Sequence, residues 1–332
     1  MKAICYTEDR SLEIREVPTL SEPAPGHVLV KMDSASIMHG DKFFLTHPLP
    51  TGIWATALHS IYGSNGGGTI TAIGAGVPER YQGRNVAICK PLKTSEKSTG
   101  LWCEVAQVPF ETCLILPNNV RVRDYNGSFA NIMTMYAFLE QTKSEGHRGV
   151  IVTAGSASTG LITAALTRRQ GIPAIFLVRS AASREKLVSL GIENVLLTTE
   201  GDFQAQLKDL AARLNATAVF DGVGGELIGR IFPALPTGGT VYVAGIMNAS
   251  TPTVISTLDV VENNLTIKRY SLLETETVLN PEKLAAAIPN IEALVDDPLL
   301  MTKIGKEFRF DEIEEAMNYD SSSGLRPVLV VR

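Results

Sequence analysis

A short stretch of small residues between an apolar run and a helical segment carries the clearest chemical signal in the chain. Val150–Thr153 is a β-branched run, and Ala154–Gly160 then consists only of Ala, Gly, Ser and Thr. Small residues let backbone N–H groups at a helix N-terminus approach a phosphate closely. Because Leu161–Gln170 has the pattern of a helix and Ala174–Val178 that of a second strand, the segment predicts a unit that binds the pyrophosphate of a dinucleotide.

The turn departs from the G-x-G-x-x-G fingerprint, because an alanine stands where a middle glycine could. A turn with small residues for packing alone is therefore the alternative interpretation. The predicted cofactor contacts in the turn are Gly155, Ser156, Ala157, Ser158, Thr159 and Gly160.

The residue that closes the second strand discriminates between the two common dinucleotides. An acid at this place would accept a hydrogen bond from a free ribose 2′-hydroxyl, whereas a guanidinium pairs with a 2′-phosphate. The residue is Arg179, so the sequence predicts NADP(H), with Ser180 and Arg184 as further phosphate contacts. The alternative is a solvent-facing arginine.

Length and composition predict a cytoplasmic globular protein of two domains. The chain has 332 residues, of which 45% are apolar and 20% charged, and its net charge is −5. Without a basic stripe, nucleic acid is excluded as a partner. No segment approaches the roughly 18 apolar residues of a membrane span, and the N-terminus lacks the pattern of a signal peptide. The four cysteines form no CxxC pair and predict reduced thiols.

The first 120 residues predict a mostly β domain. Short alternating runs such as His27–Met32, Asn85–Cys89 and Cys113–Leu116 are separated by Pro- and Gly-rich turns, which is typical of a partly open barrel. Thr46–Asn65 has little regular pattern, and a loop of that length is usually functional.

From about Asn126 strands and helices alternate, which predicts a doubly wound parallel sheet of the Rossmann type. Ligands bind beyond the carboxyl ends of such strands. The turns after Ala216–Phe220 and Gly239–Ala244 are therefore predicted to contact the cofactor. The residues concerned are Val223 and Gly224 in the first turn and Gly245, Ile246 and Met247 in the second.

Four local signals predict helix ends in the second half of the chain. Asp202 is a predicted N-cap, and Asn280 with Pro281 predicts another helix start. Pro289 is expected to kink or break the helix that follows. Asp311–Glu314 resembles a capping box.

Taken together, the motifs resemble the medium-chain dehydrogenase/reductase superfamily over nearly the whole chain. Gly63–Val77 is similar to the family's G-x-E-G-x-G-x-V signature, and Thr134–Tyr136 stands where the family often has Thr-Ala-Tyr. Phe220–Gly225 and Gly238–Val241 are similar to the fourth and fifth strands of its nucleotide-binding domain.

The resemblance implies an α/β fold: a GroES-like, mostly β catalytic domain of residues 1–122 and 269–332 around a Rossmann NADP-binding domain of residues 123–268. It also implies a homodimer in which Leu265–Tyr270 pairs across subunits. Thr134 would then lie against the nicotinamide, while Gly245–Met247, Tyr270 and Leu272 would hold its carboxamide. Arg326 stands where related chains often have a lysine near the cofactor.

Two departures from the family pattern predict a site without metal. Zinc-dependent members carry a catalytic cysteine and a His-Glu pair where this chain has Met38, Ser64 and Asn65. A thioether, a hydroxyl and a neutral amide cannot replace thiolate, imidazole and carboxylate at Zn²⁺. The chain therefore resembles the zinc-independent branch of NADPH:quinone reductases and 2-enoyl thioester reductases.

Without Zn²⁺ no strong Lewis acid polarises an isolated ketone, so the expected acceptor is a small quinone or an alkene conjugated to a carbonyl. The family's enoyl reductases carry a proton-donating tyrosine where this chain has Leu49. The candidates for a proton donor are therefore His47, Tyr62 and His39, and a proton from solvent is the alternative. Asp41 matches a family acid and is expected to be structural.

Two other functions remain open from the sequence. One is a reductase of acyl thioesters or carbonyl intermediates in a biosynthetic pathway. The other is an NADPH-binding sensor or structural protein with little turnover.

Overall fold

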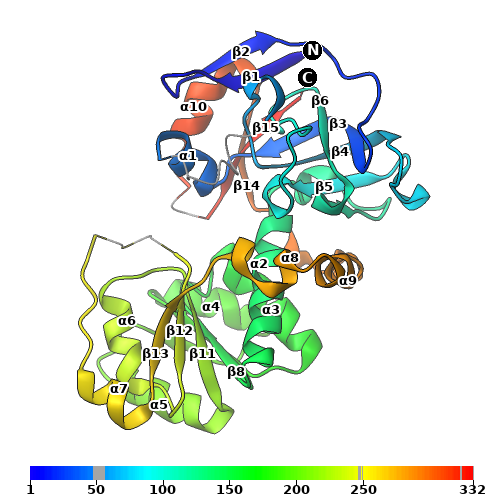
Figure 1. Cartoon of the computed structure of the whole chain (residues 1–332). Coiled ribbons are helices and arrows are strands. Elements are labelled where there is room, and N and C mark those ends of the chain that lie inside the picture. Colours follow the sequence, from blue (N-terminus) through cyan, green and yellow to red (C-terminus); the bar gives the residue numbers. More distant parts are fainter. Residues whose placement is uncertain (48–56, 246–247, 249, 322–323, 332) are drawn as a thin grey trace. The chain divides into compact units, whose positions relative to one another are not determined.

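The computed structural model describes residues 1–47, 57–245, 248, 250–321 and 324–331 (Figure 1). The chain divides into two compact units. The terminal unit comprises Met1–Met133 and Leu284–Arg332, and the central unit comprises Thr134–Lys283.

The central unit is built on a parallel sheet with the strand order β10-β9-β8-β11-β12-β13. The first strand in sequence, β8, lies inside the sheet, and the order runs outward from it in both directions, as in a doubly wound fold. The strands are β8 (Gly149–Val152), β9 (Ala174–Val178), β10 (Val195–Leu197), β11 (Ala216–Asp221), β12 (Thr240–Val243) and β13 (Thr266–Arg269). The helices between them are α3 (Ser158–Gln170), α4 (Ala181–Ser189), α5 (Phe203–Leu214), α6 (Glu226–Ile231) and α7 (Thr257–Asn263).

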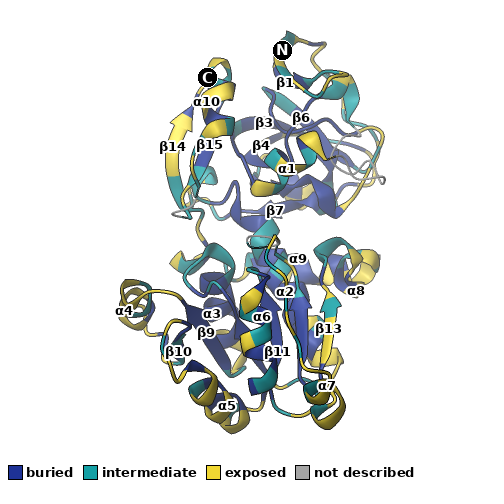
Figure 2. Ribbon diagram, turned by 90° about the vertical axis from the view of Figure 1, so that its left-hand side faces the viewer, coloured by how far each residue is buried: buried dark blue, intermediate teal, exposed yellow. Residues whose placement is uncertain are grey.

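Apolar residues on both faces explain why this sheet is covered on both sides. Because successive side chains point to opposite faces, Val219 packs with Phe203 and Leu207 of α5 on one face. Its neighbour Phe220 meets Phe138 on the other, with ring centroids 5.2 Å apart. Phe138 lies on α2 (Ser128–Ser144). Figure 2 shows β9 and β11 as buried strands, β13 as largely exposed, and helices α4, α5 and α7 with exposed outer faces.

The terminal unit has a mostly antiparallel sheet in the order β14-β15-β3-β4-β5-β7, with β6 paired to β3. A separate hairpin joins β1 (Lys2–Tyr6) and β2 (Leu12–Glu16). The strands are β3 (His27–Ser36), β4 (Asn65–Ile73), β5 (Asn85–Cys89), β6 (Val105–Pro109), β7 (Cys113–Ile115), β14 (Ile304–Phe308) and β15 (Arg326–Val330). Its helices are α1 (His39–Thr46), α10 (Ile313–Asn318) and most of α9 (Pro281–Glu292). The short α8 (Glu276–Leu279), which precedes α9, belongs to the central unit.

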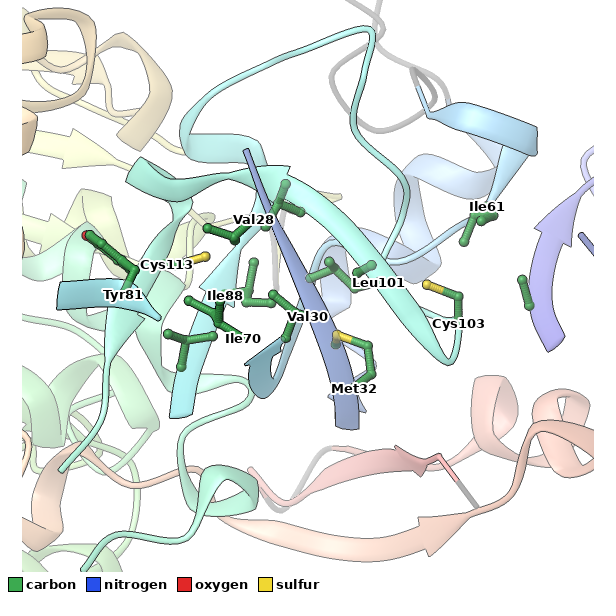
Figure 3. Packing of buried hydrophobic residues seen from close by; sticks show 14 of the residues in the cluster. Val28, Val30, Met32, Ile61, Ile70, Tyr81, Ile88, Leu101, Cys103 and Cys113 are labelled. Carbon is green, nitrogen blue, oxygen red and sulfur yellow. The ribbon is translucent and has the colours of Figure 1, made fainter. Parts of the chain in front are cut away.

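The core of the terminal unit collects the alternate residues of β3 (Figure 3). Val28, Val30 and Met32 pack with Ile70 and Ile88 from the neighbouring strands. The four cysteines Cys5, Cys89, Cys103 and Cys113 are buried free thiols. Burial raises the pKa of each thiol, to about 12 for the last three.

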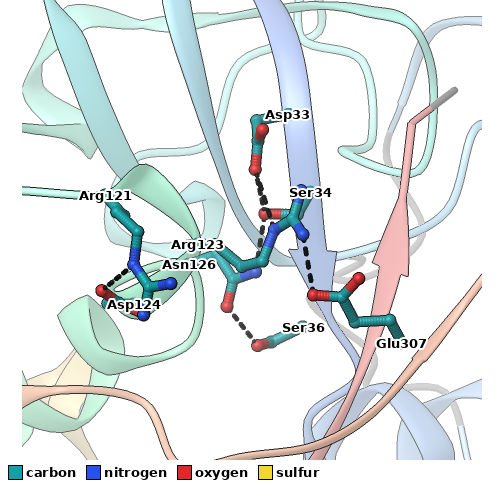
Figure 4. A network of polar contacts seen from close by, with 8 residues as sticks. All are labelled: Asp33, Ser34, Ser36, Arg121, Arg123, Asp124, Asn126 and Glu307. Atoms are coloured by element: carbon teal, nitrogen blue, oxygen red, sulfur yellow. Dashed lines mark hydrogen bonds and ion pairs between the residues drawn. The ribbon is translucent and has the colours of Figure 1, made fainter.

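A polar network fixes the segment that precedes α2 onto the terminal sheet (Figure 4). Arg123 donates to Glu307 of β14 at 2.7 Å and lies 3.5 Å from Asp33 of β3. Asn126 donates to Ser34 at 2.8 Å and accepts from Ser36 at 2.6 Å. Because Asn126 is buried and both of its polar atoms are hydrogen-bonded, these contacts fix the position of this segment on β3.

The predicted fold class is confirmed: a doubly wound parallel sheet accompanies a mostly β unit. Some local predictions were wrong. Pro289 lies inside α9 without ending it. Asp202 holds the N-cap position of α5, but its carboxylate accepts from the side chain of Gln206 instead of a backbone N–H.

The remaining helix starts differ in detail from the prediction. Asn280 does accept from the backbone N–H of Glu282 at 3.0 Å, as expected of a cap. The capping box near residue 311 begins earlier than predicted, since Glu312 accepts from the backbone N–H of Arg309 at 2.7 Å. Helix α1 was not anticipated, because its sequence lacks a strong cap signal.

Candidate functional site

The turn after β8 is as tight as the small residues suggested. A Cβ added at Gly160 would lie 2.1 Å from the carbonyl oxygen of Gly155, so a larger residue there would force the turn apart. Helix α3 begins directly after Ala157, which has no side chain able to cap it. The backbone N–H groups of its first turn therefore point to the carboxyl end of the sheet, as a phosphate site requires.

A buried carboxylate that the sequence analysis missed organises the next turn. Asp221 ends β11 and is fully buried. It accepts from the Thr153 hydroxyl at 2.8 Å and from the backbone N–H groups of Val223 and Gly224 at 3.3 and 2.8 Å. The Thr153 oxygen accepts from the N–H of Gly222 at 2.9 Å. Burial raises the pKa of Asp221, and these hydrogen bonds oppose that rise.

Asp221 therefore ties the end of β8 to the turn after β11. The turn adopts a conformation suited to glycine, with φ of +79° at Gly224 and +66° at Gly225. The signal that could have revealed Asp221 is an acid closing an apolar strand immediately before three glycines in four positions.

Gly245 lies against this turn, since a Cβ there would sit 1.9 Å from the carbonyl oxygen of Gly222. The two turns at the ends of β11 and β12 thus pack backbone to backbone. Ile246 and Met247, also predicted to contact the cofactor, lie outside the described residues.

The end of β9 presents a cationic, hydroxyl-rich surface. Arg179 and Ser180 are exposed, and the Ser180 hydroxyl accepts from the N–H of Ser183 at 3.2 Å as the N-cap of α4. Arg184 lies one turn along α4 but donates to Glu200 at 3.1 Å. The predicted phosphate contacts are therefore neighbours, with Arg184 restrained by an acid that sequence reasoning did not include.

The residues predicted for the nicotinamide side come from two elements of the central unit. Thr134 is half-buried on α2, and its carbonyl accepts from the Tyr270 hydroxyl at 2.7 Å. Tyr270 follows β13 and is buried, and Leu272 begins the next short helical turn. The Tyr270 hydroxyl thereby fixes the start of the central unit on the sheet.

The proton-donor candidates of the terminal unit have different environments. His47 is exposed and stacks on Phe43, with ring centroids 4.6 Å apart. Tyr62 is 1% exposed and donates its hydroxyl proton to the carbonyl of Asp41 at 2.8 Å. Burial also raises the pKa of Tyr62 well above its usual range. Its hydroxyl proton is therefore held in a structural hydrogen bond and is not readily released. Leu49 lies outside the described residues.

Comparisons of the sequence with known proteins find one family model and several distant relatives. A family model described as zinc-binding dehydrogenase matches residues 158–292. The chain is 20% identical to the rat synaptic vesicle membrane protein VAT-1 homolog, over 89% of this chain and 74% of that protein. The human homolog is 24% identical over 57% of this chain, but only 46% of that protein is covered.

Solved structures share the fold over the whole length. A quinone reductase structure from Mesorhizobium loti is 23% identical, with a TM-score of 0.76 over 100% of this chain and 98% of that one. Escherichia coli quinone oxidoreductase in complex with NADPH has a TM-score of 0.73 at 19% identity, covering 99% of each chain. CurK enoyl reductase has a TM-score of 0.76 at 16% identity, over 100% of this chain and 99% of that one.

The family model thus covers the central part of the chain, and the solved structures show that the whole chain has the fold of these reductases.

Met38, Ser64 and Asn65 are the residues that the sequence resemblance placed at the positions of catalytic zinc ligands in zinc-dependent dehydrogenases. Met38 directly precedes α1, Ser64 directly precedes β4, and Asn65 is the first residue of β4. Among the described residues, no group of three or more His, Cys, Asp or Glu side chains is arranged to hold a metal ion. None of the described helices has the length and apolar character needed to span a membrane.

Proposed function

We propose that this protein is an NADPH-dependent reductase that transfers hydride to a small quinone or to an alkene conjugated to a carbonyl, without a metal. The observation that carries the proposal is Arg179, an exposed guanidinium that directly follows β9, beside the tight turn between β8 and α3. In folds of this type that strand end faces the ribose of the adenosine.

The central unit fits the cofactor in three respects. Helix α3 offers N–H groups that no side chain caps. The glycine turns after β11 and β12 leave backbone instead of side chains at the carboxyl ends of the strands, and a Cβ at Gly222 would meet open space. The adenosine end carries Arg179 and Arg184. The Escherichia coli relative, which shares this fold, was solved with NADPH.

When bound, NADPH supplies the hydride and its two electrons. The residues of the chain orient it: Thr134 and Tyr270 would border the nicotinamide, and Gly245 would face its carboxamide. Arg326 of the terminal unit is a further candidate contact for the cofactor. Since hydride transfer depends on distance and angle, these contacts act by positioning.

The absence of zinc chemistry follows from the chemistry of the donor set. Met38 offers a thioether, Ser64 a hydroxyl and Asn65 an amide, and none carries the charge or basicity that Zn²⁺ ligands need. The acceptor must therefore take hydride by virtue of its own conjugation, which favours quinones and activated alkenes over isolated ketones.

The test is a screen of NADPH oxidation at 340 nm with a quinone and with a crotonyl thioester, each compared with NADH. Turnover of the quinone with NADPH in preference to NADH is the expected result. Tight NADPH binding without turnover of any acceptor would support a sensor or structural role instead. An activity that requires stoichiometric Zn²⁺ would refute the proposal.

A 2-enoyl thioester reductase is the second candidate, and the fold likeness to CurK enoyl reductase favours it. Faster turnover of the crotonyl thioester than of the quinone would select this function.

We also propose that the protein forms a homodimer through β13. Among the described residues β13 is an edge strand of the parallel sheet, which leaves backbone groups unpaired. Ile267 on this strand and Val254, Leu258 and Val261 nearby in sequence are exposed apolar side chains, Val254 and Val261 to 81% and 79%. Pairing of two such edges would bury them and extend the sheet across the subunits.

A further inference from the structure

A buried polar cluster lies at one end of the terminal sheet. We call it the Asp41 cluster, and its members are Asp41, Ser64, Asn65, Lys90 and Arg326. The strand registers bring them together: Asn65 of β4 is opposite Cys89 of β5, so Lys90 follows next to Ser64, and the Lys90 N–H donates to the Ser64 carbonyl at 3.0 Å. Arg326 begins β15, whose Val328 pairs with Ser36 near the end of β3.

Asp41 is the centre of the hydrogen bonds in this cluster. Its side chain is fully buried. One carboxylate oxygen accepts from the backbone N–H of Met38 at 2.8 Å. The other accepts from the Ser64 N–H at 3.1 Å and from the Ser64 hydroxyl at 2.6 Å. The Ser64 oxygen in turn accepts from the amide Nδ2 of Asn65 at 2.8 Å.

The charges around Asp41 are predominantly positive. Lys90 is 6% exposed and interacts electrostatically with Asp41, as does Arg326. Burial raises the pKa of Asp41 to about 6 and lowers that of Lys90 to about 8. Four titratable groups interact electrostatically with Asp41: Tyr62 before β4, Cys89 of β5, Lys90 after β5 and Arg326 of β15. Lys42, which follows Asp41 on α1, interacts electrostatically with Arg326.

Two polar atoms of the cluster point to a ligand. The Oδ1 of Asn65, a residue only 2% exposed, and the buried Nε of Arg326 have no hydrogen-bond partner among the described residues. Buried polar atoms are nearly always satisfied in native proteins. An acceptor and a donor of this kind suit an oxygen that begins as a carbonyl and ends as a hydroxyl, which is the change that reduction of the acceptor produces.

We propose that Ser64 donates a hydrogen bond, and then a proton, to the oxygen of the hydride acceptor, and that Asp41 is the positioning residue that resupplies this proton. The inference rests on the proposed reductase function. A serine oxygen has one proton and two acceptor sites. When Asp41 is a carboxylate, it holds the Ser64 proton. When Asp41 is protonated, its O–H donates to Ser64, Asn65 fills the second acceptor site, and the Ser64 proton turns outward.

The proton balance is complete. Hydride adds to carbon, and the electron pair of the conjugated bond moves onto the carbonyl oxygen. The Ser64 O–H bond breaks as the new O–H bond forms, and the proton of Asp41 passes to Ser64. Asp41 is left as a carboxylate and regains a proton from water. One hydride and one proton are consumed per turnover.

The test compares Ser64→Ala, Ser64→Thr and the control Ser98→Ala. Ser98 is a buried serine of the same unit whose hydroxyl has no partner among the described residues. We expect S64A to lower kcat with the quinone roughly ten- to a hundred-fold while the KM for NADPH stays unchanged. S64T restores the hydroxyl and most of kcat, and S98A is unaffected. The proposal also requires kcat to fall as pH rises through about 6, and D41N to flatten that profile.

A second readout does not depend on turnover. Calorimetric titration with phenol, whose oxygen resembles that of the reduced acceptor, should show about tenfold weaker binding to S64A than to the wild type and S98A. If S64A fails to fold, Ser64→Cys replaces it, with a smaller loss expected because a thiol is a weaker donor. Wild-type kcat and phenol affinity in the Ser64 variants would overturn the inference and leave the proposed function standing. A wild type that binds phenol through Ser64 but reduces no acceptor would refute the proposed function and retain the oxygen site.

Discussion

Replacing Arg179 by alanine should weaken NADPH binding and leave NADH binding nearly unchanged. The two cofactors differ only in the 2′-phosphate, so a residue that contacts this group alone changes one affinity. A charge-assisted hydrogen bond contributes about 1.5–3 kcal/mol. Each 1.4 kcal/mol corresponds to a factor of ten, so the loss is roughly ten- to a hundred-fold in Kd. Because Arg179 is exposed, solvent screening places the value near the lower end of this range.

The assay is titration of the protein with each cofactor, followed by the fluorescence of the bound dihydronicotinamide. Arg213→Ala is the matched control, because Arg213 is an exposed arginine of the same unit and its removal changes the net charge equally. Raising the ionic strength should reduce the difference between wild type and R179A. Equal losses for NADPH and NADH, or a similar loss in R213A, would refute the assignment of Arg179 to the phosphate.

Three further predictions concern other parts of the chain. Asp221→Asn places an amide N–H₂ or a weaker acceptor against the N–H of Gly224, so it should raise the KM for NADPH several-fold and lower the melting temperature. The control D221E should change only the stability. An unchanged KM in D221N would contradict the role of Asp221. Ile267→Glu on the β13 edge should shift the protein from dimer to monomer in light scattering coupled to gel filtration, and a wild-type monomer would refute the proposed dimer. Burial lowers the pKa of Lys90 from 10.5 to about 8, so between pH 8 and 10.5 the folded state binds fewer protons than the unfolded state. The free energy of unfolding, measured in urea titrations, should therefore rise with pH across this range. Lys90→Met should abolish the rise.

The sequence was sufficient to predict the strand, turn and helix from β8 to β9, because the signals for these elements are local. The turn at Ala154–Gly160 needs small residues whatever lies around it, and the φ of +65° at Gly171 ends α3 where the sequence indicated. Arg179 follows directly from the end of β9. Such signals depend on a few neighbouring residues and on strand direction, and both can be read from the pattern.

The remaining features depend on contacts between distant residues. Asp221 and Thr153 are 68 positions apart, and nothing in either segment alone indicates their hydrogen bond. The pairing of Arg184 with Glu200 likewise arises from the neighbourhood of β9 and β10. Pro289 was expected to kink or break a helix; it does not end α9, in which the neighbouring apolar residues Ile288 and Ile291 are buried. Tertiary packing overrides local preference in such cases.

The burial of all four thiols has a consequence for the proposed reduction of electrophiles. Quinones and conjugated carbonyl compounds arylate or alkylate cysteine, and the thiolate is the form that reacts. Every cysteine of the chain lies inside the terminal unit with a raised pKa, so almost no thiolate exists at neutral pH and none is presented to solvent. Under the proposed function, this burial would protect the thiols from inactivation by the quinone or conjugated alkene that the protein reduces.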